Sequence, residues 1–382
     1  MYENHTRVGL KIKKVELISA LVMFSCINIE FLNIHIPGLQ TATYYLRCAL
    51  ICIVMWKIIT KKIANINMHV ISRSTMLTIV FLMLVVISSL YNGQKIVTLT
   101  FELSYVILPV LFIDTYRKSC AINSILRVWE RILLVLILID ALTMVLMPGG
   151  LYISSSYGKN WFLGYKTLRL IYSLPLCVFS VILDFVTNNK NRKKTYFIFI
   201  LSIITLLYSQ ASAAAVGLLS VFSVLIVCDW TNKICLNKSK AGHRAKNLIN
   251  KFLSNYIWII PLYFLAIYAL INIANLTFMQ VIVEKGLNKD ITLTNRTVLW
   301  STCIDLIGKH RMLGYGYLSP DNYRELFNNV FYTSPHNLIL SLFMTVGGVG
   351  TIIYLFIIID SMRKLHRKNN IVSIVLLAGI IC

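Results

Sequence analysis

Charged residues are scarce in this sequence, and acidic residues are the scarcest of them. Asp and Glu number 15 in 382 residues, all charged residues together make up 14%, and apolar residues make up 57%. A soluble domain must cover itself with more polar surface than this composition provides. The mean hydropathy of +0.73 agrees. We therefore expect a membrane protein.

Other signals are missing as well. The basic start runs into a full-length apolar segment without a small-residue cleavage site, so we expect the first helix to act as its own signal anchor. Of the nine cysteines only Cys303 falls in a segment predicted to lie outside, which excludes an exported disulfide framework. The outer loops hold scattered acidic residues with no Asp-x-Asp and no His or Cys cluster, so we expect no metal and no cofactor.

Apolar runs long enough to cross a bilayer recur along the chain. About 20 apolar residues are needed for one crossing. The run from 195 to 228 would be about 50 Å long as one helix, so we expect it to double back near Ser209 and Ser212. The predicted spans are 17–36, 42–60, 75–91, 96–113, 128–147, 168–187, 195–209, 211–228, 256–274 and 337–359. The fold class is thus all-α, a polytopic membrane protein of about 10–12 transmembrane helices forming one domain over 1–382.

Basic residues are in excess, with a formal net charge of +22. They gather in short clusters between the apolar runs instead of alternating with recognition elements, so we expect no nucleic-acid partner. Most of them fall in loops that become cytoplasmic when the N-terminus is placed inside. This orientation leaves two sizeable segments outside, 148–168 and a long extracytoplasmic loop at 275–334.

Ionisable residues within the predicted spans lie at a common depth. Glu30, Arg47, Glu102 and Asp140 all fall in the outer halves of their spans. A charge in lipid is costly, so such residues either form structural pairs, for example Glu30 with Arg47, or line a wet cavity. Their shared depth favours a cavity that opens outward.

The long outer loop contains a predicted amphipathic helix at 294–307. Its apolar residues recur at helical spacing, with Arg296 one turn before Trp300: Leu299, Trp300, Cys303, Ile304 and Ile307. An interfacial anchor explains the apolar stripe but not Arg296. The following Gly314-Tyr315-Gly316 sequence predicts a tight turn that brings backbone amides and tyrosine faces close to a ligand.

The end of this loop predicts a capped return into the membrane. Ser334 suits an N-cap and Pro335 the first helical position, which would put His336 in the first turn of the next helix. There the helix dipole disfavours imidazolium, so we expect a neutral His336 that can accept a proton. A solvated interfacial histidine is the structural alternative.

The order of these short motifs resembles the O-antigen polymerase and O-antigen ligase family. The resemblance rests on Asn295-Arg296 with Trp300, on 313–316, on His336-Asn337-Leu338 and on the glycines at 347–350, with 162–166 and 209–217 in support. The sequence lacks the arginine that often follows the serine of the 209–212 turn. The last apolar run also stops at Cys382, where the family usually completes a helix.

The resemblance implies a glycosyltransferase of the bacterial cytoplasmic membrane, acting in capsule or exopolysaccharide synthesis. It would join polyprenyl-pyrophosphate-linked oligosaccharide repeats on the outer face, with membrane lipid, a flippase and a chain-length regulator as partners. Arginine suits the departing diphosphate, because it is always charged and binds phosphate oxygens with two donors. We expect His336 and Arg296 to be catalytic. The predicted substrate-binding residues are Arg169, Arg47, Lys166, Tyr315 and Asn337.

Three other functions remain open at this point. A ligase of the same family would use the same donor with a different acceptor. A flippase would also carry buried charges, but transporters commonly show internal repeats and interrupted helices near the midplane, and the charges here are shallow. A membrane scaffold without activity would be unaffected by changes at Arg296 or His336.

Overall fold

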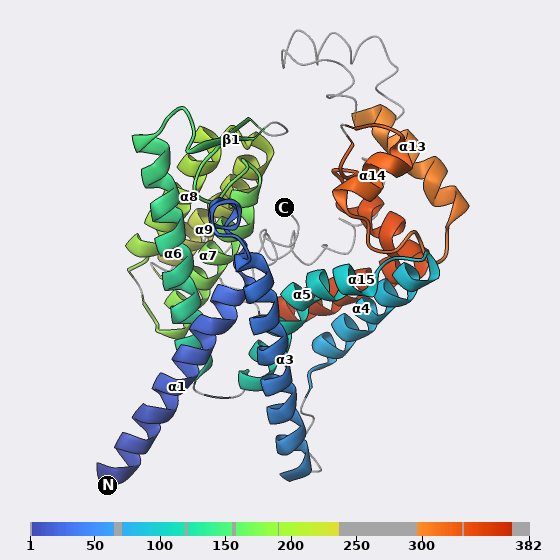
Figure 1. Cartoon of the computed structure of the whole chain (residues 1–382). Coiled ribbons are helices and arrows are strands. Elements are labelled where there is room, and N and C mark those ends of the chain that lie inside the picture. The colour runs from blue at the N-terminus through green and yellow to red at the C-terminus, as the bar shows by residue number, and fades with distance from the viewer. Residues whose placement is uncertain are drawn as a thin grey trace. The chain divides into compact units, whose positions relative to one another are not determined.

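The computed structural model describes residues 2–64, 71–117, 119, 121–154, 158–189, 191–236, 296–330 and 332–368 (Figure 1). Within them the chain is helical apart from one short hairpin, in which β1 (Tyr152–Ser154) pairs antiparallel with β2 (Gly158–Asn160). The helices are α1 (Tyr2–Cys26), α2 (Glu30–His35), α3 (Leu39–Ala64), α4 (Arg73–Tyr91), α5 (Ile96–Tyr116), α6 (Ile122–Leu146), α7 (Leu168–Val186), α8 (Lys193–Tyr208), α9 (Ser212–Leu236), α13 (Arg296–Lys309), α14 (Pro320–Phe327) and α15 (Leu338–Lys368).

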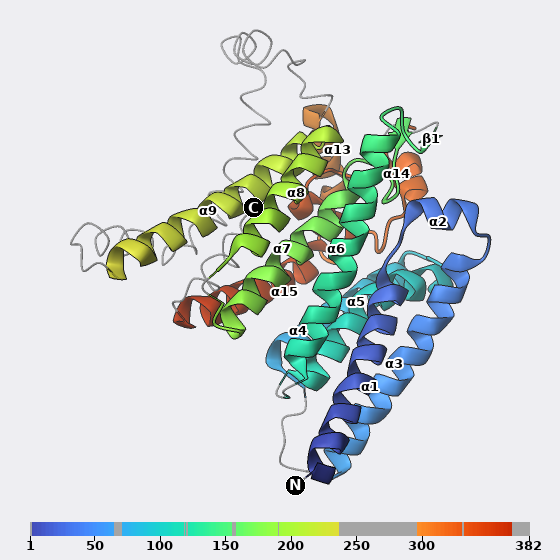
Figure 2. The same ribbon diagram turned by 90° about the vertical axis from the view of Figure 1, so that its left-hand side faces the viewer.

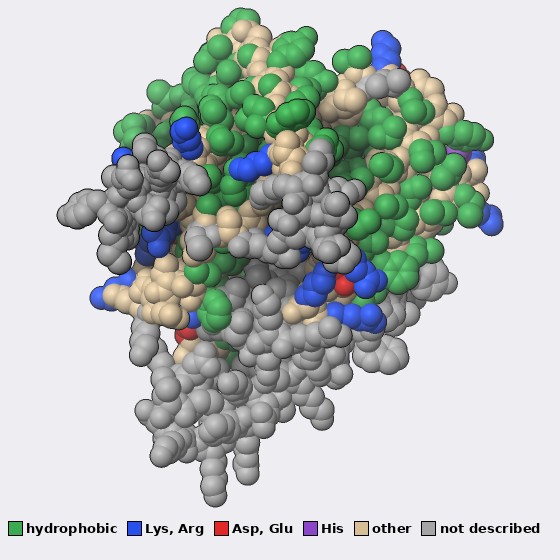
Figure 3. Space-filling view, turned by 90° about the horizontal axis from the view of Figure 1, so that it is seen from below, with side chains coloured by type: hydrophobic (Ala, Val, Ile, Leu, Met, Phe, Trp, Pro, Cys, Tyr) green, Lys and Arg blue, Asp and Glu red, His purple; other side chains and the backbone are tan. Residues whose placement is uncertain are grey.

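Five helices of the described chain are long and apolar enough to cross a membrane. They contain the segments Leu39–Thr60, Arg73–Tyr91, Val97–Tyr116, Leu168–Val186 and Leu338–Lys364. Hydrophobic side chains cover much of the described surface that Figure 3 shows, and Lys and Arg stand there in small groups. This is the surface that lipid requires. The chain is an all-α polytopic membrane protein, as its composition predicts.

Most of the predicted spans coincide with helices, and the predicted reversal is confirmed. Helix α8 ends at Tyr208 and α9 begins at Ser212, with Gln210 in the left-handed region at φ 60°. The first predicted span, 17–36, is wrong as one continuous helix. Helix α1 ends at Cys26, and Glu30 begins the separate short helix α2. The predicted span 256–274 and residues 275–295 of the loop 275–334 lie outside the described residues.

The chain divides into two compact units, which are described separately. The described residues of 1–72, 104–250 and 365–382 belong to unit 1, and those of 73–103 and 251–364 belong to unit 2. In unit 1, α1 packs on α3 and α6, and α6 to α9 pack in succession, as Figure 2 shows. The hairpin and a following loop connect α6 to α7 at one end of this bundle.

Unit 2 combines α4, the first part of α5, and the helices α13, α14 and α15. The stripe predicted on α13 is buried here, with Leu299 and Cys303 packed in one cluster with Tyr323 of α14 and Met344 of α15. Ile304 corrects the prediction, because it was expected in the same stripe and is exposed instead. Placement of α13 at the membrane interface stays a prediction, but its Trp300 is in a protein core and not at a lipid surface.

Candidate functional site

Helix α15 is broken at Gly347, and the break determines the shape of unit 2. Gly347 has φ 62° and ψ −163°, a backbone conformation far from helical. Such a break leaves carbonyls without partners on one side and N–H groups without partners on the other. Inside a membrane protein these groups must find partners within the protein.

The Gly-Tyr turn supplies those partners. The N–H groups of Tyr315 and Gly316 donate to the carbonyls of Met344 and Thr345, at 2.6 and 2.9 Å. In return the N–H of Gly348 donates to the carbonyl of Arg311 at 2.8 Å. The predicted tight turn is therefore present, and its backbone amides bind the broken helix instead of facing a ligand.

Glycine is required where the two segments meet. Gly314 has φ 68°, and a Cβ there would lie 2.6 Å from the Met344 carbonyl oxygen. A Cβ on Gly347 would overlap the carbonyl of Met312. The glycines of two motifs far apart in sequence thus permit one close backbone contact.

Polar side chains at the end of α4 hold the outer side of the turn. The Asn92 amide donates to the carbonyls of Ser88 and Gly314, at 2.8 and 3.1 Å. The Gln94 amide donates to the carbonyl of Tyr315 at 3.0 Å. The bonds to Gly314 and Tyr315 join residues more than 200 positions apart in sequence, and they fix the wall of a cavity.

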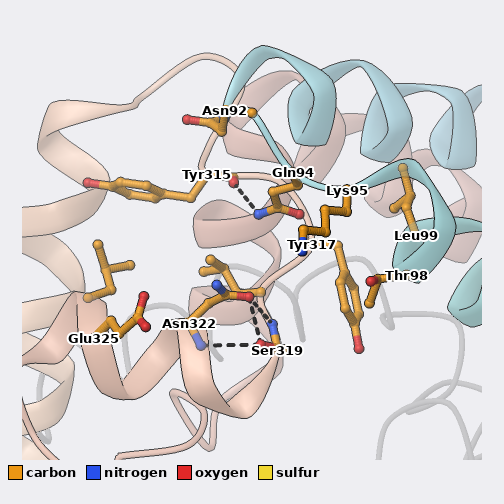
Figure 4. Close-up of a pocket in the computed structure, with 13 residues that line it drawn as sticks. Asn92, Gln94, Lys95, Thr98, Leu99, Tyr315, Tyr317, Ser319, Asn322 and Glu325 are labelled. Atoms are coloured by element: carbon orange, nitrogen blue, oxygen red, sulfur yellow. Dashed lines mark hydrogen bonds between the residues drawn. The ribbon is translucent and has the colours of Figure 1, made fainter.

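The cavity has a volume of about 690 Å³ and lies wholly within unit 2. Figure 4 shows Gln94 and Lys95, from the connection between α4 and α5, opposite Asn322 and Glu325 of α14. The full lining is Asn92, Gly93, Gln94, Lys95, Thr98, Leu99, Tyr315, Tyr317, Leu318, Ser319, Asn322, Glu325 and Leu326. Polar and apolar groups are mixed, as in sites for small polar ligands.

Tyrosines form part of the lining. Burial raises the pKa of Tyr317 above its ordinary value, and the nearby Glu102 carboxylate raises it further. The Tyr315 hydroxyl donates to the Leu306 carbonyl at 3.0 Å, and the His310 ring lies against the Tyr315 ring with centroids 4.2 Å apart. Of the predicted substrate-binding residues, Tyr315 is the one that lines this cavity.

His336 lies outside the helix, which corrects the predicted cap. It has φ 50° and is exposed, and α15 begins two residues later at Leu338. Asn337 is the capping residue, because its side-chain oxygen accepts the N–H groups of Ile339 and Leu340 at 3.0 and 3.1 Å. The argument from a first-turn position therefore does not apply to His336. The Ser334 hydroxyl lies 3.2 Å from its Nδ1.

The segment that carries His336 is attached to the start of α13. The Trp300 indole donates to the carbonyl of Pro335 at 3.0 Å in a buried position. Arg296 is the first residue of α13, one turn before Trp300. The backbone positions of Arg296 and His336 thus belong to one end of unit 2. The Arg296 side chain lies outside what the structure describes.

Arg169 is buried in unit 1 and paired with Asp140. Its Nε lies 2.7 Å from Asp140 Oδ2, and both side chains are 1% exposed. The guanidinium also lies 5.2 Å from the Trp161 ring centroid. Its Nη1 is buried and has no hydrogen-bond partner among the described residues. This predicted substrate-binding residue thus has one buried guanidinium nitrogen that no described residue engages.

Two carboxylates hold the segment before α7 by its backbone. Asp140 accepts the N–H of Leu163 at 2.8 Å, and Glu30 accepts the N–H of Tyr165 at 2.9 Å. A Cβ on Gly164, which has φ 99°, would overlap Glu30. Glu30 thus has a structural partner in this segment, and the neighbouring Lys166 lies 6.0 Å from the Tyr165 ring centroid.

Arg47 is also buried in unit 1. Its Nε donates to the Ser104 hydroxyl at 2.8 Å, its Nη1 donates to the Ser25 carbonyl, and its guanidinium lies 3.6 Å from the Tyr105 ring centroid. Arg47, Arg169 and Lys166 belong to unit 1, whereas Tyr315, Asn337, Arg296 and His336 belong to unit 2. Their predicted convergence on one diphosphate stays a prediction.

Of the polar residues that line the cavity, Tyr315 alone was predicted from the sequence as a site residue. Asn92, Gln94, Lys95, Asn322 and Glu325 come from two stretches far apart in sequence. One signal was available, an Asn-Gly turn followed by Gln94 and Lys95 in an otherwise apolar region. In the described part of the chain no group of three His, Cys, Asp or Glu residues is placed to hold a metal ion. Metal independence stays a prediction.

Comparison with known families agrees with the motifs. Residues 197–355 match the family model described as O-antigen ligase. The match includes α13, the Gly-Tyr turn, α14 and the break in α15. No curated protein and no solved structure matches the chain significantly. The match at 197–355 supports an assignment to the O-antigen polymerase and ligase family, and with it a membrane enzyme that handles glycans.

Proposed function

We propose that this protein is a polysaccharide polymerase. It joins polyprenyl-pyrophosphate-linked oligosaccharide repeats on the outer face of the bacterial cytoplasmic membrane, with its N-terminus in the cytoplasm and without a metal ion. A flippase would deliver the repeats, and a chain-length regulator would act with the enzyme. The observation that carries the proposal is the Trp300 to Pro335 hydrogen bond, because it attaches the helix that begins at Arg296 to the segment that carries His336.

The reaction forms one bond and breaks one. The acceptor hydroxyl loses its proton to His336, and its oxygen bonds to the anomeric carbon of the donor sugar. The bond from that carbon to the phosphate oxygen breaks, and the diphosphate keeps the electron pair. Histidine is the commonest general base, and the exposed position of His336 leaves it open to solvent and substrate.

The departing diphosphate needs positive charge and hydrogen-bond donors. The sequence motifs offer Arg296 and Arg169 for this role. The ion pair with Asp140 reduces the net charge of Arg169 but holds its guanidinium in one orientation. Arg47 and Lys166 would add to this donor set.

Replacement of His336 tests the proposal. In cells that express His336→Ala at the wild-type level, we expect lipid-linked single repeats to accumulate on the outer face and polymer to fall at least about 100-fold, the range of general-base catalysis. Gel analysis of polymer and mass spectrometry of the lipid-linked pool measure both. His35→Ala, an exposed histidine of α2, is the matched control. Normal polymer length in His336→Ala would refute the role of His336.

A ligase is the second candidate, because the matching family model is described as O-antigen ligase. Deletion of a ligase would leave polymerised chains on the lipid carrier, whereas deletion of a polymerase leaves single repeats. Repeats held on the inner face would instead indicate a flippase. The length and sidedness of the accumulated glycan separate all three.

A further inference from the structure

The cavity of unit 2 takes no part in the proposed bond-forming step, yet its polar groups are arranged for a ligand. The Asn92 amide donates to the carbonyls of Ser88 and Gly314, and the Gln94 amide donates one hydrogen to the carbonyl of Tyr315. Their side-chain oxygens receive no hydrogen bond from the described residues and are left as acceptors. Glu325, exposed on α14, adds a carboxylate to the same lining.

Donors are fewer in the lining. Lys95 is exposed and contributes the single cation among the lining residues. Asn322 uses its side-chain oxygen to accept the Ser319 N–H at 3.1 Å and the Ser319 hydroxyl at 2.6 Å, so its amide NH₂ remains as a donor. Thr98 contributes a hydroxyl, which both donates and accepts.

Because acceptors outnumber donors in the lining, the cavity distinguishes between the diphosphate and the sugars of a lipid-linked oligosaccharide. A diphosphate has oxygens but no hydrogens to donate, so it gains nothing from the side-chain oxygens of Asn92 and Gln94 and is repelled by the Glu325 carboxylate. A sugar ring carries hydroxyl groups that donate to such acceptors and also accept from Lys95 and Asn322. The lining therefore suits the saccharide.

The apolar lining and the size of the cavity agree with this choice. Leu99, Leu318 and Leu326, with Tyr317, offer the apolar surface that the C–H faces of a sugar ring pack against. The volume of about 690 Å³ is within the roughly 300–1,000 Å³ of small-molecule sites. The walls are preformed, because backbone hydrogen bonds fix the turn to α15.

We propose that this cavity is a saccharide subsite that binds sugar residues of the lipid-linked repeat away from the reacting bond. The subsite deepens the proposed function and depends on it for the identity of the glycan. It would discriminate among repeats by the hydroxyl patterns that fit Asn92, Gln94 and Glu325. Sugar specificity would then reside in the connection between α4 and α5 and in α14.

Direct binding to the purified protein in detergent tests the subsite without turnover. The probe is the free oligosaccharide released by mild acid from the lipid-linked repeats of a deletion strain, measured by saturation-transfer NMR and calorimetry. Glu325→Ala and the space-filling Thr98→Trp should each weaken binding about 10-fold, the loss expected when a hydrogen bond to a charged group is removed. Asp321→Ala and Lys309→Ala are matched controls on α14 and α13 outside the cavity.

Inorganic diphosphate is the second probe, and we expect that it does not compete with the oligosaccharide. Competition by diphosphate, or unchanged binding in both cavity variants, would overturn the proposal. His336→Ala should bind the oligosaccharide as the wild type does. If His336→Ala still makes polymer while Glu325→Ala loses binding, the proposed reaction fails and the subsite stands.

The bound sugars could come from the acceptor or from the donor. In a turnover assay, excess free oligosaccharide should restore the activity of Glu325→Ala if the cavity holds the acceptor glycan. Excess lipid-linked repeat should restore it if the cavity holds the donor glycan. Loss of activity that neither addition restores, with normal oligosaccharide binding, counts against a subsite.

Discussion

Arg169 and Asp140 form a fully buried ion pair that also holds the backbone of the loop before α7. A buried pair is a poor source of stability, since both charges must leave water, but removal of one partner leaves the other uncompensated. Asp140 accepts hydrogen bonds from two groups that its removal would leave without a partner, the Arg169 Nε and the Leu163 N–H. The residue is therefore structural whatever part Arg169 takes in binding diphosphate.

Asp140→Ala should destabilise unit 1 by about 3–5 kcal/mol. Thermal unfolding of the purified protein in detergent measures this as a large fall in Tm. The double variant Asp140→Leu with Arg169→Leu should recover much of the loss, because it removes both charges. Asp321→Ala is the control, since Asp321 is 80% exposed in its pair with Arg324, and such surface pairs contribute about 0–1 kcal/mol. An unchanged Tm for Asp140→Ala would contradict the structural role.

The break in α15 and the Gly-Tyr turn are the elements that give unit 2 its shape. Four backbone hydrogen bonds cross between them, from Tyr315, Gly316, Gly348 and Val349. The Ser88 hydroxyl of α4 donates to the carbonyls of Leu313 and Thr345 and so contacts both partners. A helix interrupted in this way is stable only while its partner segment is in place.

Gly347→Ala should unfold this arrangement. The backbone conformation of Gly347 is essentially restricted to glycine and costs another residue roughly 1–3 kcal/mol, and the added Cβ would overlap the Met312 carbonyl. We expect a lower Tm and loss of polymer. Gly308→Ala is the control of opposite sign, because Gly308 lies inside α13 with open space around it and Ala is better in a helix by roughly 1 kcal/mol. Equal Tm values for the two variants would contradict the assigned role of Gly347.

Sequence patterns predict the elements of this fold better than its interruptions. Apolar length alone predicts α3 to α9, and the excess length of 195–228 predicts the reversal at 209–211. The break at Gly347 depends on Met312 and Gly314, more than 30 residues earlier, and no local signal distinguishes it from glycines that permit helix packing. The cap at Asn337 escaped prediction because Ser334 and Pro335 offered an equally good local pattern.

The candidate site was predicted only in part, because it too depends on contacts between distant segments. Periodicity located α13 and its buried stripe, and residue chemistry singled out His336 and Tyr315. The cavity combines 92–99 with 315–326, and such a combination arises only from tertiary packing.

At the scale of the whole molecule, the distribution of charge predicts a single orientation in the membrane. The excess of Lys and Arg in alternate loops predicts an N-terminus in the cytoplasm and a cavity at the outer surface. This side is where a flippase would deliver lipid-linked repeats.

Cysteine labelling tests the orientation. In a variant without native cysteines, Lys159→Cys and Lys309→Cys should react with a membrane-impermeant maleimide in intact cells. Lys193→Cys, which is equally exposed, should react only after permeabilisation. The reverse pattern would place the cavity in the cytoplasm and exclude polymerisation on the outer face.

The hydrogen bonds between the Gly-Tyr turn and the broken helix α15 also limit when unit 2 can fold during biosynthesis. Residues 311–316 are synthesised before α15, and Ser88 and Asn92 long before either. The backbone partners of 311–316 become available only when 344–349 have left the ribosome. Unit 2 therefore cannot close during insertion of α4 and α5, and a nascent chain that stops before residue 344 would keep these polar groups exposed for quality-control proteases to find.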